Sequence, residues 1–165
     1  TLPTPETALP RPTSPYGVTK LAGEHLCYLY WRNFEVPCVS LRYFTVYGPG
    51  QRPDMAFRKL FERLLHGGAF HVYGDGRQTR DFTYIDDIVN GTILAWERGA
   101  PGEVYNLGGG SRISLNEVLA IAAELTGKKP LVEYRESQKG DVRNTAAGIG
   151  KARRELKYEP AVAIA

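Results

Sequence analysis

The chain has few of the residues that build disulfide scaffolds and metal sites. It contains two cysteines, three histidines and one methionine among 165 residues. Cys27 and Cys38 fall in one segment expected to be helical and one expected to be extended, without close metal-ligand spacing. His25, His66 and His71 also lack tight spacing and an acidic third ligand. We therefore expect reduced thiols, a cytoplasmic location and no metal site.

Long apolar runs and one-sided charge are absent as well. No apolar stretch approaches the roughly 20 residues that a membrane-spanning helix needs. The net charge of +3 is modest, and basic residues are interspersed with acidic ones, a pattern that is not typical of nucleic-acid binding. With 42% hydrophobic and 24% charged residues, the composition is that of an ordinary soluble globular protein. It predicts no membrane and no nucleic-acid partner, and it is compatible with anionic small substrates.

A phosphate-binding glycine loop is the third absence. A dinucleotide site needs G-x-G-x-x-G between a strand and a helix, so that backbone amides can approach a pyrophosphate. Gly108, Gly109 and Gly110 come closest but lack the third spaced glycine. We interpret them as a flexible strand-to-helix turn, and the chain by itself has no predicted cofactor cradle.

Helical and strand-like segments alternate along the chain. Ser14 followed by Pro15 is a typical helix start, and Ser114 with Glu117 has the spacing of a capping box. Apolar periodicity predicts helices over 15–34, 57–66, 85–98, 115–125 and 149–156. Extended segments are expected at 36–43, 70–73, 79–83, 104–107 and 131–134. This alternation predicts an α/β fold.

Tyr16 and Lys20 are the first candidate catalytic pair. They are four residues apart at the start of the first expected helix, so the phenol and the ammonium group share one face. A lysine beside a phenol favours the phenolate by charge, and a tyrosine so placed can act as a general base. Two common residues also meet this spacing by chance, and then merely lie on a solvated helix face.

Several longer strings place this pair in a wider pattern. They are SPYGVTK at 14–20, LRYFTVYGPGQRPDMAF at 41–57, VYGDGRQTRDFTYIDD at 72–87, YNLGGG at 105–110, GDVR at 140–143 and KARRELKYEP at 151–160. In order and spacing they resemble the second half of the extended short-chain dehydrogenase/reductase family, in its NAD-dependent nucleotide-sugar epimerase and dehydratase branch. The resemblance covers nearly the whole chain and is far more specific than the tyrosine–lysine spacing.

The resemblance implies a Rossmann-like NAD domain joined to a smaller domain that binds the nucleotide sugar. We expect this chain to be a fragment that begins after the family's glycine-rich loop. Residues 1–47 are then expected to be the end of the Rossmann-like domain, with the catalytic helix and the following strand. Residues 48–165 are expected to form mainly the nucleotide-sugar-binding domain, with some segments returning to the Rossmann-like domain. A homodimer is the expected assembly of the full-length protein.

The same resemblance implies roles for individual residues. Tyr16 is the expected acid/base and Lys20 the ligand of the nicotinamide ribose. The implied cofactor-binding residues are Tyr16, Lys20, Tyr43 and Thr45. The implied substrate-binding residues are Thr45, Arg52, Phe57, Val72, Tyr73, Gln78, Arg80, Asp141 and Arg143. Bound NAD would take a hydride from carbon 4 of a UDP-sugar and return it to the other face, through a 4-keto intermediate.

Arg80 and Arg143 match the family's arginines at the nucleotide diphosphate, where planar guanidinium groups suit paired phosphate oxygens. Without the surrounding strings they read as surface arginines with Asp81 and Asp141 as carboxylate neighbours. Asp141 resembles a residue that contacts the uridine ribose. Residues 70–73 resemble the strand beside the uracil, although these aromatic side chains could equally belong to the core.

Thr45 and Arg52 bear on the identity of the sugar. Many UDP-glucose 4-epimerases have asparagine in place of Thr45, whereas RYFTVYGP together with RPDMA resembles bacterial UDP-glucuronate 4-epimerases. In that group the matching residues lie near the sugar carboxylate, and a cationic fork there disfavours a neutral hydroxymethyl group. Arg52 could instead be a solvated loop arginine.

The implied function is therefore a UDP-glucuronate 4-epimerase that forms UDP-galacturonate, inactive as this fragment alone. Two alternatives within the enzyme class stay open, UDP-glucose 4-epimerase and UDP-glucuronate decarboxylase. A noncatalytic nucleotide-sugar-binding module is the alternative from another class.

Overall fold

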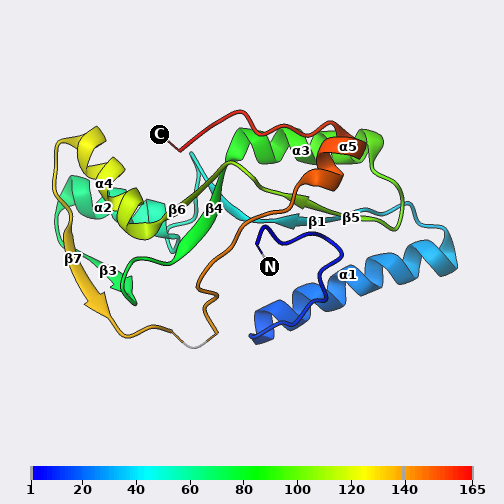
Figure 1. The fold of residues 1–165 in the computed structure, drawn as a ribbon, viewed down its shortest axis with the longest axis horizontal. Helices are drawn as coiled ribbons and strands as arrows, with labels where there is room; N and C mark the ends of the chain where they lie inside the picture. The colour runs from blue at the N-terminus through cyan, green and yellow to red at the C-terminus, as the bar shows by residue number, and fades with distance from the viewer. Residues whose placement is uncertain (1, 139, 165) are drawn as a thin grey trace.

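Strands and helices alternate in the computed structural model, which describes residues 2–138 and 140–164 (Figure 1). The helices are α1 (Pro15–Phe34), α2 (Ala56–His66), α3 (Ile85–Arg98), α4 (Leu115–Thr126) and α5 (Gly150–Leu156). The strands are β1 (Ser40–Tyr43), β2 (Thr45–Tyr47), β3 (Ala69–Tyr73), β4 (Thr79–Tyr84), β5 (Val104–Leu107), β6 (Ser111–Ser114) and β7 (Leu131–Arg135). The predicted α/β class is confirmed. None of the described helices is long and apolar enough to cross a bilayer.

Both predicted helix starts have the expected caps. The Ser14 side chain accepts a hydrogen bond from the Gly17 amide at 3.2 Å, and Pro15 begins α1. At α4 the Glu117 amide donates to Ser114 Oγ at 3.2 Å, and the Ser114 amide donates back to Glu117 Oε2 at 2.7 Å. Each arrangement satisfies amides at a helix start that have no partner within the helix.

The described strands form three small sheets. β1 pairs with β5 and β3 pairs with β7, both in parallel. β4 lies between β2, to which it is parallel, and β6, to which it is antiparallel. The two extended segments around Gly74–Gly76 are confirmed, but they belong to different sheets, so their connection joins β3 to β4 without pairing them.

The three glycines after β5 are a correction to the sequence analysis. They were expected to form a flexible strand-to-helix turn. They lead instead into the short strand β6, and two of them are held by hydrogen bonds. The amide of Gly109 donates to Asp81 Oδ1 at 2.8 Å, and the carbonyl of Gly108 accepts from the Tyr158 hydroxyl at 3.1 Å. Asp81 is buried, and its other oxygen accepts from the Ala147 amide at 2.7 Å. Charge-assisted bonds of this kind hold the turn in place.

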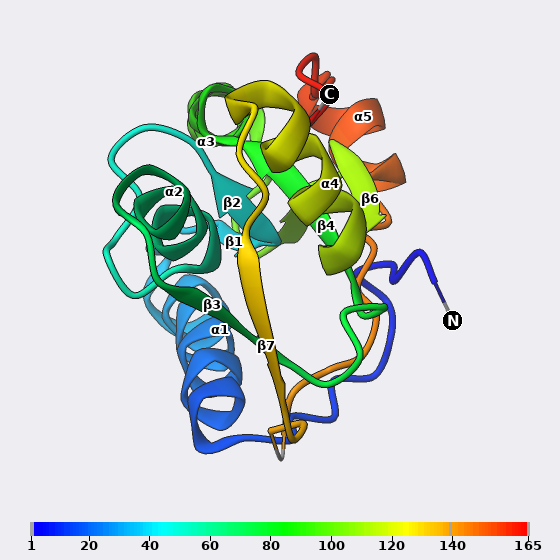
Figure 2. The same ribbon diagram turned by 90° about the vertical axis from the view of Figure 1, so that its left-hand side faces the viewer.

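Two apolar cores lie toward opposite ends of the molecule (Figure 1). One joins β1 and β5 to α3 and α5, with buried Tyr105, Leu107, Leu156 and Tyr158 among its members. The other joins α2, α4, β3 and β7, around Leu60, Phe70, Val72 and Phe82 of β4. Figure 2 looks onto this second end and shows α2 and α4 on either side of β7. The assignment of one core to a cofactor domain and the other to a substrate domain stays a prediction.

Helix α1 is joined to β1 by a forked ion pair. None of its residues is buried. Arg42 of β1 donates from Nε to Glu24 Oε2 at 2.8 Å and from Nη2 to Glu24 Oε1 at 2.6 Å. The hydrogen-bonded Glu24 carboxylate raises the pKa of Arg42, against the opposing effect of burial. This forked pair positions the helix that begins at the predicted catalytic residues.

Candidate active site

Tyr16 and Lys20 lie on one face of the first turns of α1, as the spacing predicts. The Lys20 ammonium is 5.3 Å from the centre of the Tyr16 ring. The Tyr16 side chain is exposed, and none of the hydrogen bonds among the described residues uses its hydroxyl. The pair therefore presents a phenol and a cation to solvent, where a ligand can reach both.

Arg80 is the second residue of β4 and the most shielded arginine of the candidate site. Its Nη2 donates to Asp141 Oδ1 at 2.6 Å, and its Nη1 donates to the carbonyls of Thr79 and Arg143 at 3.1 Å each. Its side chain is only 20% exposed. The partner is thus Asp141, far along the chain, and not the adjacent Asp81, which faces the buried glycine turn.

Arg143 reaches across to the loop between β3 and β4. Its Nη2 donates to Asp75 Oδ2 at 3.0 Å. The pKa of Asp75 is lowered, chiefly because the Arg77 amide donates to its carboxylate, with Arg143 adding to the effect. Two aspartate–arginine pairs therefore join the β3–β4 loop and the start of β4 to the segment 141–143.

The other residues expected at the nucleotide divide between surface and core. Tyr73 is the last residue of β3 and half exposed, and its carbonyl accepts from Gln78 Nε2 at 2.9 Å. Val72 is fully buried, backbone included, and belongs to the second core. Phe57 also packs in the core, stacked on Tyr47 with ring centres 5.2 Å apart. Of the aromatics in 70–73, Phe70 belongs to the core and Tyr73 faces outward.

A hydrogen bond from a side chain to the backbone links the segment before α1 to the segment that carries Asp141 and Arg143. Thr13 Oγ1 donates to the carbonyl of Gly140 at 3.4 Å. Gly140 has a positive φ of 83°, and a Cβ there would lie 3.2 Å from the Thr13 carbonyl oxygen, so the close approach favours glycine. Figure 1 shows the chain between β7 and α5 passing beside the start of α1. Residues near 16, near 80 and near 141 thus meet in one region.

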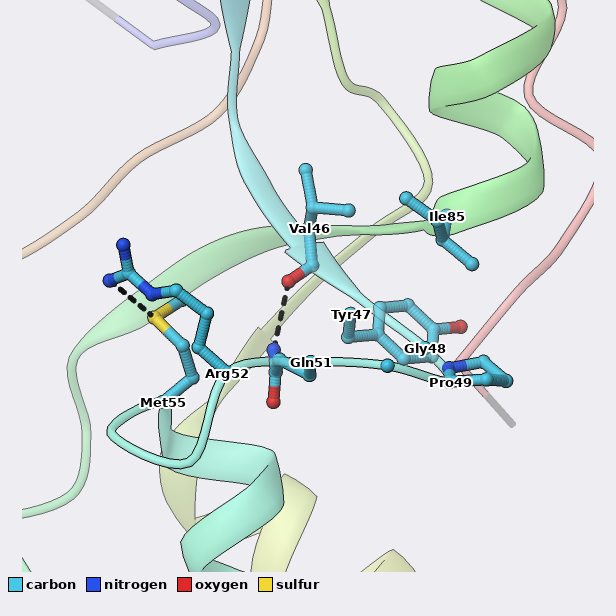
Figure 3. Close-up of a pocket in the computed structure, with 9 residues that line it drawn as sticks. Val46, Tyr47, Gly48, Pro49, Gln51, Arg52, Met55 and Ile85 are labelled. Atoms are coloured by element: carbon cyan, nitrogen blue, oxygen red, sulfur yellow. Dashed lines mark hydrogen bonds between the residues drawn. The ribbon is translucent and has the colours of Figure 1, made fainter.

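A pocket of about 350 Å³ opens at the other end of β4 from Arg80, where that strand leads into α3; it lies between β2, the loop after it and α3 (Figure 3). Its lining consists of Val46, Tyr47, Gly48, Pro49, Gly50, Gln51, Arg52, Met55 and Ile85. Thr45 begins β2 directly before this lining, and Arg52 lies at its edge. Arg52 forms a forked pair with Asp54, from Nε to Oδ1 at 3.1 Å and from Nη2 to Oδ2 at 3.0 Å.

Gln51 is a residue of this pocket that the sequence analysis did not single out. Its Nε2 donates to the Val46 carbonyl at 3.0 Å, and its Oε1 accepts from the Arg58 amide at 3.1 Å. It thus ties the loop to β2 on one side and to α2 on the other. Gln51 lies in a loop rich in proline and glycine, where side chains follow no periodic pattern, so the sequence could not identify this role.

Four residues were expected to hold the cofactor. Tyr16 and Lys20 are exposed, and neither side chain has a hydrogen bond within 2–138 and 140–164, which suits the hydroxyl groups of a ribose. Tyr43 ends β1, and its hydroxyl is 3.0 Å from Thr92 Oγ1 of α3. The amide of Gly109 is already bonded to Asp81, so the glycine turn is not a pyrophosphate cradle. Tyr16 and Lys20 therefore suit the nicotinamide ribose of a dinucleotide, whereas the glycine turn does not suit its phosphates.

A family model described as NAD dependent epimerase/dehydratase family matches residues 2–108. The chain belongs to this family. The predicted resemblance is therefore confirmed. Of the six strings that carried it, four lie wholly or mostly within the matched residues, from α1 to β5.

Relatives of known name agree with this membership. The UDP-glucuronic acid 4-epimerase from Bacillus cereus, solved with UDP-glucuronic acid and NAD, is 48% identical with a TM-score of 0.93, over 96% of this chain and 51% of that one. The UDP-glucuronate 4-epimerase of Thermodesulfobacterium geofontis is 43% identical over 93% of this chain and 47% of its own length. A Bacillus subtilis protein named Uncharacterized UDP-glucose epimerase YtcB is 45% identical over 93% of this chain and 49% of its own length. The chain spans about half the length of the curated relatives that it matches.

Proposed function

We propose that the full-length protein is a nucleotide-sugar 4-epimerase that converts UDP-glucuronate to UDP-galacturonate with NAD. The observation that carries the proposal is the contact between Thr13 and Gly140. It sets a helix that begins with an exposed tyrosine–lysine pair beside two arginines that can hold phosphates. A base for the sugar and anchors for its nucleotide then lie in one region, as an epimerase of this family requires.

Tyr16 is the proposed acid/base. Its exposed hydroxyl can approach the sugar 4-hydroxyl and, as phenolate, remove that proton while carbon 4 is oxidised. Lys20, 5.3 Å from the ring centre, stabilises the negative oxygen through space. In the return step Tyr16 gives the proton back to the reduced oxygen, so the chain ends the cycle in its starting protonation state.

Arg80 and Arg143 are the proposed diphosphate ligands. Each presents a planar guanidinium group, which can donate two parallel hydrogen bonds to phosphate oxygens. Their present partners, Asp141 and Asp75, hold them at the surface of the site. Asp141, released from Arg80 by a phosphate, is then free to accept from a ribose hydroxyl.

Tyr16, Lys20, Tyr43 and Thr45 are the residues of this chain that would hold NAD. The cofactor supplies a reversible hydride acceptor at carbon 4 of the sugar. The fit is to its nicotinamide ribose, because the donors of Tyr16 and Lys20 are exposed on one face of α1. Anchors for the phosphates are expected from chain outside these residues.

Arg52 supports an acidic sugar. It lies at the edge of the pocket that follows Thr45, and a carboxylate at carbon 5 would match its fork. The name of the Bacillus subtilis relative supports a second candidate, a UDP-glucose 4-epimerase. Thr45 stands where many UDP-glucose 4-epimerases have asparagine, so it and Arg52 both favour the acidic sugar in this proposal.

The test is to follow full-length protein with NAD and UDP-glucuronate, and separately UDP-glucose, by NMR. The proposal expects UDP-galacturonate from the acidic sugar. A UDP-pentose with release of carbon dioxide would make the protein a decarboxylase, and turnover of UDP-glucose alone would make it a neutral-sugar epimerase. Tyr16→Phe should lose about 10²- to 10⁴-fold in kcat with UDP binding retained. Full activity in that variant would remove Tyr16 from the role of base.

A further inference from the structure

The fork of Arg52 already holds a carboxylate. Asp54, two residues away on the same loop, accepts from Nε at 3.1 Å and from Nη2 at 3.0 Å. The Arg52 and Asp54 side chains are 75% and 64% exposed. An ion pair this exposed contributes little to stability, so its exchange for another carboxylate is easy. The pair therefore adds little to the stability of the fold, and a ligand carboxylate can compete with Asp54 for Arg52.

The geometry of this pair is that of a ligand carboxylate. Two oxygens of one carboxylate meet two neighbouring nitrogens of the guanidinium side by side, which is how arginine binds carboxylates in general. A sugar carboxylate that used the same edge of Arg52 would have to replace Asp54. The third nitrogen, Nη1, has no hydrogen bond among the described residues, and the Met55 sulfur lies 3.8 Å from Nη2.

The loop that presents the pair is anchored independently of it. Gln51 bonds to the Val46 carbonyl and to the Arg58 amide, on opposite sides of the loop. Gly48 before it has a positive φ of 142°, and a Cβ there would meet the Ile85 side chain. Exchange of partners on Arg52 therefore needs only side-chain rotation, with the pocket wall left in place.

We infer that Asp54 is a specificity-determining residue, which neutralises Arg52 until the carboxylate of an acidic sugar replaces it. The inference rests on the proposed function of the site. With a neutral sugar the Arg52–Asp54 ion pair stays formed, so the sugar does not lie beside an unpaired guanidinium group. With an acidic sugar the new pair forms at the expense of the old one, and Asp54 is left as a nearby like charge. Asp54 thus weakens the binding of acidic sugars and leaves that of neutral sugars unchanged, which lowers the ratio of the two affinities.

The experiment is a set of binding titrations on full-length protein saturated with NAD. UDP-glucuronate, UDP-glucose and UDP are each titrated calorimetrically into wild type and Asp54→Asn. Removal of the competing charge should tighten UDP-glucuronate by about two- to fivefold, the range expected for an exposed pair. UDP-glucose should not tighten and UDP should be unchanged. Asp54→Glu, which keeps the carboxylate, is the matched control and should keep the wild-type ratio of the two Kd values.

A second pair of variants tests whether the effect passes through Arg52. In an Arg52→Met background the cation for which Asp54 and the sugar carboxylate compete is gone, so Asp54→Asn should change the Kd ratio much less than in wild type. An unchanged ratio in Asp54→Asn, or an equal change in Asp54→Glu, would overturn the inference. Because the titrations need no turnover, they stand apart from the NMR test of epimerisation. Epimerisation with an unchanged ratio refutes Asp54 alone, and a shifted ratio without epimerisation refutes the proposed reaction alone.

Discussion

Each of the three arginines that the sequence singles out has an aspartate partner, but the three pairs differ in shielding. The Arg80 side chain is 20% exposed and also donates to two backbone carbonyls. The Arg143 side chain is 68% exposed, and among the described residues it donates to Asp75 alone. A guanidinium group held by several acceptors is preorganised, and less rotamer entropy is lost when a phosphate binds it. Arg80 should therefore contribute more to nucleotide affinity than Arg143.

Replacement of either arginine by lysine tests this order. Lysine keeps the charge but loses the fork, and hydrogen bonds to charged groups are worth about 1.5–3 kcal/mol. We expect Arg80→Lys to weaken UDP binding by roughly 10- to 100-fold and Arg143→Lys by roughly fivefold or less. Calorimetry with UDP on full-length protein measures both, with thermal melting as a check on folding. Equal losses in the two variants would contradict the order.

Asp75 makes the β3–β4 loop sensitive to acid. Its pKa lies below the ordinary 3.8 in the folded protein, chiefly through the Arg77 amide. A carboxyl group with a lowered pKa stabilises the fold at pH values above its ordinary pKa, and this contribution is lost as pH falls through the lowered value. Asp75→Asn should therefore lower Tm at pH 6, and the difference from wild type should shrink below pH 3.8. A Tm difference that does not change with pH would contradict this assignment.

At the scale of elements, the two capped helices differ in what they contribute to the cores. α4 supplies Val118, Leu119 and Ala122 to the second core, whereas α1 supplies no buried residue. A cap on α4 therefore supports a helix that unfolds with the core. A cap on α1 supports a helix whose first turns can open locally.

Ser114→Ala should lower the free energy of unfolding by about 1 kcal/mol, because α4 loses the side-chain acceptor at its start. Ser14→Ala removes a similar bond but should change global unfolding less, since α1 packs loosely. Urea denaturation of the 165-residue chain measures both variants. Ser114→Thr is the control, because threonine keeps the capping oxygen. A larger loss from Ser14→Ala would mean that α1 unfolds together with the core.

The helices were predictable from the sequence to within a residue or two, because their caps and periodicity are local. The strands were less so. The segment from 36 is extended only from Ser40 onward, and β2 and β6 escaped prediction because each is a short strand that gains its partners from β4. A pattern of a few residues cannot carry information about pairing with a distant strand. For the same reason the sequence did not indicate that Gly109 is held by Asp81.

At the scale of the whole molecule, the candidate site likewise combines features that local spacing predicts with contacts between distant segments that it does not. The tyrosine–lysine pair follows from helical spacing alone, and its shared face is confirmed by the 5.3 Å contact. The partners of Arg80 and Arg143 lie more than 60 residues away along the chain and could not be derived from spacing. Gln51 and Asp54 gave no signal, because their roles arise from the loop conformation.

The surface of α1 indicates how this part of the protein behaves by itself. Leu26, Tyr30 and Phe34 follow one another at intervals of four, and all are exposed. Contiguous apolar side chains of this kind mark a contact surface. In the full-length protein we expect them to be covered by chain outside these residues or by a second subunit.

The isolated 165-residue chain should therefore self-associate. Sedimentation velocity over a range of concentrations should show a rising average mass. The double variant Leu26→Glu/Tyr30→Glu should reduce it, because two like charges would be buried in the contact. Val89→Glu with Ile93→Glu, on the exposed face of α3, is the matched control. A monomer at every concentration, or equal effects of the two double variants, would assign no contact role to α1.

The junction of Thr13 with Gly140 has a consequence for how substrate size relates to rate. Gly140 adjoins the residue proposed to read the ribose, and Thr13 adjoins the cap of the helix that carries Tyr16, so a nucleotide bound as proposed would hold both segments against each other. Part of the binding energy of the distant uridine then goes into placing the phenol at the sugar and not into affinity. The nucleotide would then raise kcat and not only affinity, and a sugar without it would react slowly even at saturating concentration.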